Sequence, residues 1–296
     1  MSEPDFNTKR LWGPRPNYPA VRAARGWNGG EMLAVLGPCS VESAAMIDDI
    51  ARVIAALPRL GIALLRGGIW RAGTYPPPAK EYGLRLNRLR WLRDAGRAHS
   101  LPVIAEVLDV RDVERIDRYV DAFQVGARQG QGYALLTELA RSKKPVLLKR
   151  GAGMKLDEFL GAAEYLARGR CRPILVERGG ASIHDHVRWD LSISLIAAVK
   201  RLTGLPIIVD ASHGTGRRDL VAPMTYAGMA AGADGFLVEC HQKPTESCTD
   251  TDQSYPLNEI NVLHSRAAHL YNLDRYVQGT ISKGSVTWTG NRKGGF

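Results

Sequence analysis

The sequence has few cysteines and no long apolar run, and each absence excludes a class of protein. Its four cysteines are Cys39, Cys171, Cys240 and Cys248, with no CxxC pair among them, which argues against a small disulfide scaffold. No apolar run approaches the roughly 18 residues that span a bilayer. The first residues lack the apolar segment of a secretory signal. We therefore expect a cytoplasmic protein with no membrane partner.

Acidic residues are outnumbered by basic ones, 30 Asp and Glu against 40 Lys and Arg, which gives a net charge of +10. Such a balance attracts anions: nucleic acid, an acidic membrane, or a small phosphorylated or carboxylated substrate. Part of the excess lies on one predicted helix, in Arg85, Arg88, Arg90, Arg93 and Arg97. We interpret this row as a solvated helix face, with a polyanion or subunit contact as the alternative. No recognition motif for nucleic acid accompanies it, so we expect no nucleic-acid partner.

A repeating pattern organises most of the chain. Of its 296 residues, 45% are apolar, as is typical of globular proteins. From residue 33 onward, a short aliphatic run, a polar or glycine-bearing tip and a helical segment recur. The eight runs cover residues 33–40, 62–68, 102–108, 122–128, 145–151, 173–179, 206–213 and 235–241. Helices are predicted over residues 43–57, 84–99, 155–167, 189–202 and 217–230.

Continuous apolar strands bounded by helices indicate a parallel sheet that is covered on its outside. An open doubly wound sheet would carry a glycine-rich phosphate motif after its first strand, and the sequence GPCSVES found there is not one. Eight units close a barrel, so we predict an α/β fold, a single (β/α)8 TIM barrel with short N- and C-terminal extensions. The predicted parts are an arm over 1–32, a catalytic barrel over 33–272 and a tail over 273–296, with a short strand over 280–288.

Cations gather at the predicted strand ends, where barrel enzymes carry their sites. They are Arg66, Arg128, Lys149, Arg150 and Arg178, and Arg217 and Arg218 follow the seventh strand. Several cations at one barrel mouth repel each other unless an anion is present, so a polyanionic ligand is indicated. The alternative is that some of them form scaffold salt bridges with Glu106, Glu177 or Asp210.

A second group of strand-end residues offers metal ligands. Cys39, His213 and Glu239 lie at strand tips, and Asp250 follows in the loop after the eighth strand. One thiolate, one imidazole and two carboxylates can hold a divalent ion such as Mn, Fe, Co or Zn. The alternative is that Cys39 and His213 are packing and hydrogen-bonding residues.

The tips in order read GPCSVES, LLRGG, VGAR, LLKRG, VERG, VDASHGTGRRDLV and GADGFLVECHQKP. This series resembles the 3-deoxy-D-arabino-heptulosonate 7-phosphate (DAHP) synthases, and among them the short microbial type related to 3-deoxy-D-manno-octulosonate 8-phosphate synthases. The resemblance implies an enzyme that joins phosphoenolpyruvate (PEP) to an aldehyde sugar phosphate and releases phosphate. It also implies a homodimer or homotetramer.

Residue by residue, the resemblance implies two sets of roles. Cys39, His213, Glu239 and Asp250 would be the metal ligands, and the PEP-binding residues would be Arg66, Ala127, Arg128, Lys149 and Arg178. The expected catalytic residues are Lys149, Arg71 and His241, with a metal-bound water as a further proton carrier and a scaffold hydrogen-bonding role as the alternative for His241. Because arginine is a poor general acid, Arg71 is the weakest of these. Glu106 and Asp210 are expected to orient their neighbours.

One segment departs from the family pattern. Where relatives read Lys-Pro-Arg-Thr, this chain reads Arg71, Ala72, Gly73 and Thr74, so the arginine that binds the acceptor's phosphate is absent and only Thr74 survives as an acceptor contact. Either Lys80 or Arg217 replaces it and the acceptor is erythrose 4-phosphate, or the acceptor is another aldehyde. The loss of one charged contact costs about 1.5 to 3 kcal/mol, and we favour the changed acceptor.

Two further readings stay open at this point. A binding protein that kept the PEP pocket without turnover would also explain the altered segment, although all four metal positions are intact. Some relatives carry a feedback-binding domain at one end, and we expect none here, because 32 residues precede the barrel.

Overall fold

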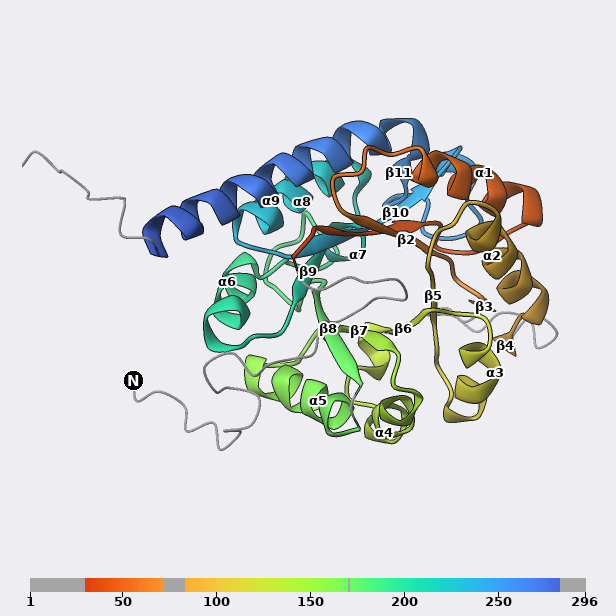
Figure 1. Cartoon of the computed structure of the whole chain (residues 1–296), viewed down its shortest axis with the longest axis horizontal. Coiled ribbons are helices and arrows are strands. Elements are labelled where there is room, and N and C mark those ends of the chain that lie inside the picture. The colour runs from red at the N-terminus through yellow and green to blue at the C-terminus, as the bar shows by residue number, and fades with distance from the viewer. Residues whose placement is uncertain (1–29, 72–82, 170, 283–296) are drawn as a thin grey trace, which may run out of the picture.

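Eight parallel strands close into a barrel in the computed structural model, which describes residues 30–71, 83–169 and 171–282 (Figure 1). The strands are β1 (Leu33–Gly37), β2 (Ile62–Arg66), β5 (Val103–Glu106), β6 (Ala122–Val125), β7 (Pro145–Lys149), β8 (Arg172–Glu177), β9 (Ile207–Asp210) and β10 (Gly235–His241). Each pairs with the next, and β10 returns to β1 with Gly235 opposite Leu33. The predicted (β/α)8 barrel is confirmed.

Helices cover the outside of this barrel (Figure 1). They are α1 (Ala44–Ala55), α2 (Leu86–Ala98), α3 (Val113–Asp117), α4 (Tyr133–Ser142), α5 (Leu156–Arg168), α6 (Ile193–Leu202), α8 (Arg218–Ala230) and α9 (Ile260–Ser282). The short helix α7 (Ala211–Thr215) follows β9 directly and lies at the barrel mouth. Two small pairings flank the barrel: β3 (Trp70–Arg71) runs antiparallel to β4 (Gly83–Leu84), and β11 (Tyr255–Pro256) lies beside β10.

Alternation along the strands fixes what faces the barrel axis. Successive side chains of a strand point to opposite faces, and one set forms an apolar cluster inside the ring: Leu33, Val35, Leu64, Ile104, Ala122, Leu147, Ile174, Val176, Ile208 and Leu237. The other set packs against the helices. The residues two positions further along these strands also point toward the barrel axis. They are Arg66, Glu106, Gln124, Lys149, Arg178, Asp210 and Glu239. A polar layer therefore lies directly above an apolar plug formed by this cluster.

Two boundaries differ from the sequence-based expectation. The helix expected from residue 189 begins at Ile193, because Gly180 and Asp190 first form an antiparallel bridge. Helix α9 continues through residue 273 to Ser282, so the strand expected over 280–288 begins inside a helix. The apolar spacing of Leu263, Ala267 and Tyr271, all buried, is helical and lets α9 propagate. The arm over 1–29 and the tail beyond 282 lie outside the described residues.

No helix in the described part of the chain is long and apolar enough to cross a membrane.

Replacing Leu147 in the plug with alanine should lower the free energy of unfolding by about 2–5 kcal/mol, because the side chain is fully buried and leaves a cavity. Urea unfolding measures this loss. Leu273→Ala is the matched control, since Leu273 is 59% exposed, and its change should stay within about 0.5 kcal/mol. Equal losses in the two variants would contradict the plug.

Candidate functional site

Glu239, fully buried near the end of β10, joins three side chains from different parts of the chain. Arg66 donates to Glu239 Oε1 over 2.6 Å, and His213 Nε2 lies 3.1 Å from the same oxygen. Gln253 donates its amide to Oε2 over 2.6 Å. Burial alone would raise the pKa of Glu239, but His213 and Arg66 hold it well below its ordinary value. The carboxylate is therefore ionised inside the barrel.

Asp210, at the end of β9, is the second buried carboxylate of this layer. Its Oδ2 lies 2.8 Å from Lys149 Nζ and 2.8 Å from His213 Nδ1. Burial opposes ionisation, yet His213 and Lys149 lower the pKa of Asp210. His213 thus bridges two carboxylates. Burial lowers the pKa of His213, but the charges of Asp210 and Glu239 outweigh that effect and raise it.

Three of the four predicted metal ligands come together. One ligand atom each of Cys39, Glu239 and Asp250 lies within 4.8 Å of the others, and Cys39 Sγ contacts Asp250 Oδ2 at 2.9 Å. Burial, followed by the charges of Glu239 and Asp250, raises the pKa of the Cys39 thiol. A thiol between two carboxylates fits a divalent cation, which would stabilise the thiolate and offset the repulsion. His213 touches Glu239 but is not part of this cluster.

A close backbone approach places Cys39. Gly68, in the LLRGG tip, packs so tightly that a Cβ there would lie 1.9 Å from the Cys39 carbonyl oxygen. The Gly68 carbonyl accepts the backbone N–H of Val41 over 2.9 Å. The glycine after β2 therefore fixes the segment after β1, which explains why the tip requires glycine at this position.

Arg178, just beyond β8, is a buried cation that lacks full compensation. Its Nε has no hydrogen-bond partner among the described residues, and its guanidinium lies over the Trp189 ring at 5.3 Å. Burial lowers the pKa of Arg178, and the neighbouring cations Arg188 and Arg128 lower it further, against Asp210 and Glu177. An anionic ligand bound here would relieve the repulsion. Ala127 and Arg128 lie in the short helical turn that follows β6.

Other predicted cations do not share this role. Arg150 makes two bonds to the buried Glu177, at 2.6 and 2.8 Å, and both residues have the outward parity of their strands, so they form a scaffold pair. Arg66 and Lys149 each pair with a carboxylate and still face the mouth. Arg217 pairs with Asp219 at the surface.

The structure describes only some of the remaining catalytic and acceptor candidates. His241 Nδ1 lies 2.7 Å from the Lys243 carbonyl oxygen, and its Nε2 is buried with no hydrogen-bond partner among the described residues. The side chain of Arg71 lies outside the described part of the chain, as do Thr74 and Lys80. Gln253 was missed by sequence reasoning, and the only signal for it is its place three residues after Asp250.

Comparison with known proteins decides the family. The model of the DAHP synthetase I family matches residues 20–272. The chain belongs to this family. Phospho-2-dehydro-3-deoxyheptonate aldolase of Thermotoga maritima is 38% identical over 226 residues, which make up 76% of this chain and 65% of that relative. The chain thus spans slightly less than two thirds of this relative's length.

Two further likenesses support the family. A 2-dehydro-3-deoxyphosphooctonate aldolase of Acidovorax sp. is 28% identical over 249 residues, 77% of this chain and 86% of the relative. Among solved structures, the DAHP synthase of Thermotoga maritima superposes with a TM-score of 0.76 at 36% identity, over 82% of this chain and 70% of that one. A truncated form of the Thermotoga enzyme gives 0.72 at 33% identity, over 84% and 88% of the two chains.

Arg150 and Arg178, both buried, should respond differently to mutation. Arg150→Met leaves the buried Glu177 without its counter-charge, held by the backbone N–H groups of Gly179 and Ser192, so it should lower the free energy of unfolding by about 3–5 kcal/mol. Arg178→Met removes a cation that its neighbours repel, and should cost less than about 1.5 kcal/mol. Titration with inorganic phosphate should show at least about tenfold weaker binding for Arg178→Met and unchanged binding for folded Arg150→Met. The reverse pattern would refute these roles.

Proposed function

We propose that this chain catalyses the metal-dependent condensation of PEP with an aldehyde, which yields a 3-deoxy-2-keto acid and phosphate. The observation that carries the proposal is the undercompensated Arg178 at the same barrel end as the thiol and carboxylate cluster of Cys39, Glu239 and Asp250. Membership of the DAHP synthetase I family supports it. So do relatives named as a phospho-2-dehydro-3-deoxyheptonate aldolase and a 2-dehydro-3-deoxyphosphooctonate aldolase.

PEP would lie over the cationic side of the mouth. In the proposal, Arg128 and Arg178 bind its phosphate and carboxylate together with Arg66, Lys149 and the Ala127 backbone. Because Arg66 and Lys149 are already held by Glu239 and Asp210, their donors are fixed before the ligand arrives, and little reorganisation accompanies binding. The cations also hold two anionic reactants against their mutual repulsion.

Cys39, Glu239 and Asp250, with His213 beside them, would hold a divalent ion drawn from Mn, Fe, Co or Zn. When bound, such an ion supplies Lewis acidity that polarises the aldehyde oxygen. C3 of PEP then forms a bond to the aldehyde carbon, water adds at C2, and the resulting hemiketal phosphate expels inorganic phosphate. Lys149 Nζ and His241 Nε2 are the proposed proton carriers, and Arg71 is retained as a third candidate.

The acceptor is the least conventional part of the proposal. Gly73 stands where the family pattern has an arginine, so we propose an aldehyde other than erythrose 4-phosphate, contacted by Thr74. We also propose that the enzyme works in the cytoplasm as a homodimer or homotetramer. The arm over 1–32 and the tail over 273–296 would lie outside the catalytic barrel.

Phosphate release from PEP should require the metal cluster. With Mn²⁺ and an accepted aldehyde, release should be abolished by EDTA and by Cys39→Ala, because each removes the electrophile. Cys171→Ala is the matched control: this thiol is also buried but lies before β8, at the opposite end of the strands. Cys171→Ala should retain activity. Release that persists in EDTA would contradict the metal requirement.

An acceptor panel tests the Gly73 substitution. Phosphate release should be measured with erythrose 4-phosphate, arabinose 5-phosphate and unphosphorylated sugars, at saturating PEP. Because Gly73 replaces the arginine that binds the acceptor's phosphate in relatives, we expect a higher kcat/KM for another aldehyde than for erythrose 4-phosphate. A preference for erythrose 4-phosphate would identify an ordinary DAHP synthase, while PEP binding without release from any acceptor would favour the non-catalytic reading.

A further inference from the structure

The Asp250 loop (residues 249–254) reaches the site through two side chains. Asp250 contacts Cys39 Sγ at 2.9 Å, and Gln253 donates to Glu239 over 2.6 Å. The backbone of Asp250 has a φ of 51°, in the left-handed region that a residue with a Cβ adopts at some cost. Within the loop, the Ser254 N–H donates to the Asp250 carbonyl over 3.1 Å. The position of Asp250 therefore depends on what anchors this loop to the barrel.

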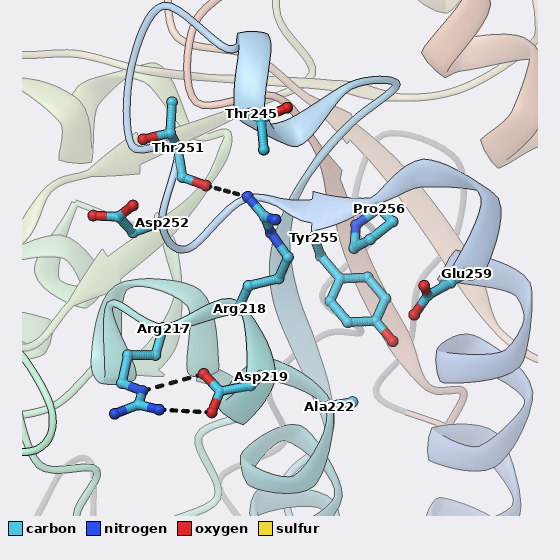
Figure 2. Close-up of a pocket in the computed structure, with 10 residues that line it drawn as sticks. All are labelled: Arg217, Arg218, Asp219, Ala222, Thr245, Thr251, Asp252, Tyr255, Pro256 and Glu259. Carbon is cyan, nitrogen blue, oxygen red and sulfur yellow. Dashed lines mark hydrogen bonds and ion pairs between the residues drawn. The ribbon is translucent and has the colours of Figure 1, made fainter.

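Arg218, the first residue of α8, makes three bonds to this loop. Its backbone N–H donates to the Asp252 carbonyl over 2.7 Å. Its guanidinium donates to the Ser254 carbonyl over 2.7 Å and to the Thr251 carbonyl over 2.6 Å, the latter drawn in Figure 2. The two guanidinium donors are charged and all three acceptors are main-chain carbonyls, so the loop backbone itself is held rather than a mobile side chain.

The neighbouring arginine serves as a natural contrast. Arg217 turns to Asp219, with bonds of 3.1 and 2.8 Å (Figure 2), and this pair lies at the surface. Both arginines line a surface cavity of about 690 Å³, together with Thr251, Asp252 and Tyr255. Of the two, Arg218 is the one whose guanidinium bonds to the loop carbonyls.

We propose that Arg218 is a positioning residue for the metal site and acts through Asp250. The proposal rests on the metal site of the proposed function. Only Gly216 and Arg217 separate α7, which carries His213, from α8, so Arg218 ties the loop with Asp250 to the segment with His213. One side chain thereby holds the Asp250 loop against the segment that carries His213, which itself contacts Glu239 of the cluster.

Cobalt binding measures this role without turnover. Co²⁺ bound by the Cys39 thiolate gives a sulfur-to-metal charge-transfer absorption, and its titration yields a dissociation constant. Arg218→Met should weaken Co²⁺ binding about tenfold or more, as for other residues that orient metal ligands. Arg217→Met, the control, should stay within about twofold, because it removes a surface ion pair. An unchanged Co²⁺ affinity in folded Arg218→Met would overturn the proposal.

A double-mutant cycle separates positioning from general stability. If Arg218 acts through Asp250, Arg218→Met should weaken Co²⁺ binding by less than about twofold in an Asp250→Asn background. The same tenfold loss in both backgrounds would show that Arg218 supports the fold rather than Asp250, and would overturn the proposal.

A milder substitution covers the case in which Arg218→Met does not fold. Arg218→Lys keeps the charge and the backbone bond but loses the two-pronged guanidinium contact, so Co²⁺ binding should weaken severalfold and an unchanged affinity would overturn the role. If wild-type protein gives no charge-transfer band while PEP still binds, the metal site fails and the role of Arg218 fails with it. A normal charge-transfer band in the wild-type protein, with unchanged Co²⁺ affinity in the Arg218 variants, overturns the positioning role of Arg218 but leaves the metal site standing.

Discussion

The burial of ionised carboxylates above an apolar plug is the constraint on which the mouth of this barrel depends. Glu239 and Asp210 have no solvent exposure, and a charge in such a place is stable only when partners surround it. Arg66, Lys149 and His213 supply this compensation and are held rigid by it. The same interactions that make the carboxylates tolerable also fix the cations and the imidazole, so the site is organised before any ligand binds.

The sequence predicted the barrel and most of this layer because both follow from local periodicity. Aliphatic runs that end in a charged or glycine-bearing tip mark strands whose carboxyl ends meet at one mouth, and this placed Arg66, Lys149, Arg178, Asp210 and Glu239 correctly at strand ends. The grouping of strand-end cations missed one distinction, which alternation along the strand provides. Lys149 and Arg150 are adjacent, so they must face opposite sides of their strand, and Arg150 pairs with Glu177 behind the sheet.

What the sequence did not predict depends on contacts between distant segments. Gln253 bonds to Glu239 because its loop folds back onto the end of β10. Arg218 bonds to the same loop from the start of α8. Neither contact can be predicted from local sequence spacing. His213 contacts Glu239 of the cluster and also Asp210, three residues earlier in the chain, and the second of these contacts was not anticipated from the spacing. Helix α9 runs to Ser282, into the segment where the sequence suggested a short strand, because the helical spacing of its buried residues up to Tyr271 lets the helix propagate.

The closure of the barrel has a consequence for the order in which the molecule is made. Cys39 follows the first strand and Asp250 the last, 211 residues later, and they meet only because β10 pairs with β1. A chain still emerging from the ribosome therefore has only Cys39 of the three cluster residues until β10 and the Asp250 loop are made. A metal ion could bind all three residues only after β10 has paired with β1. Its binding would then stabilise a strand pairing that forms slowly because of the entropy cost of closing so long a loop.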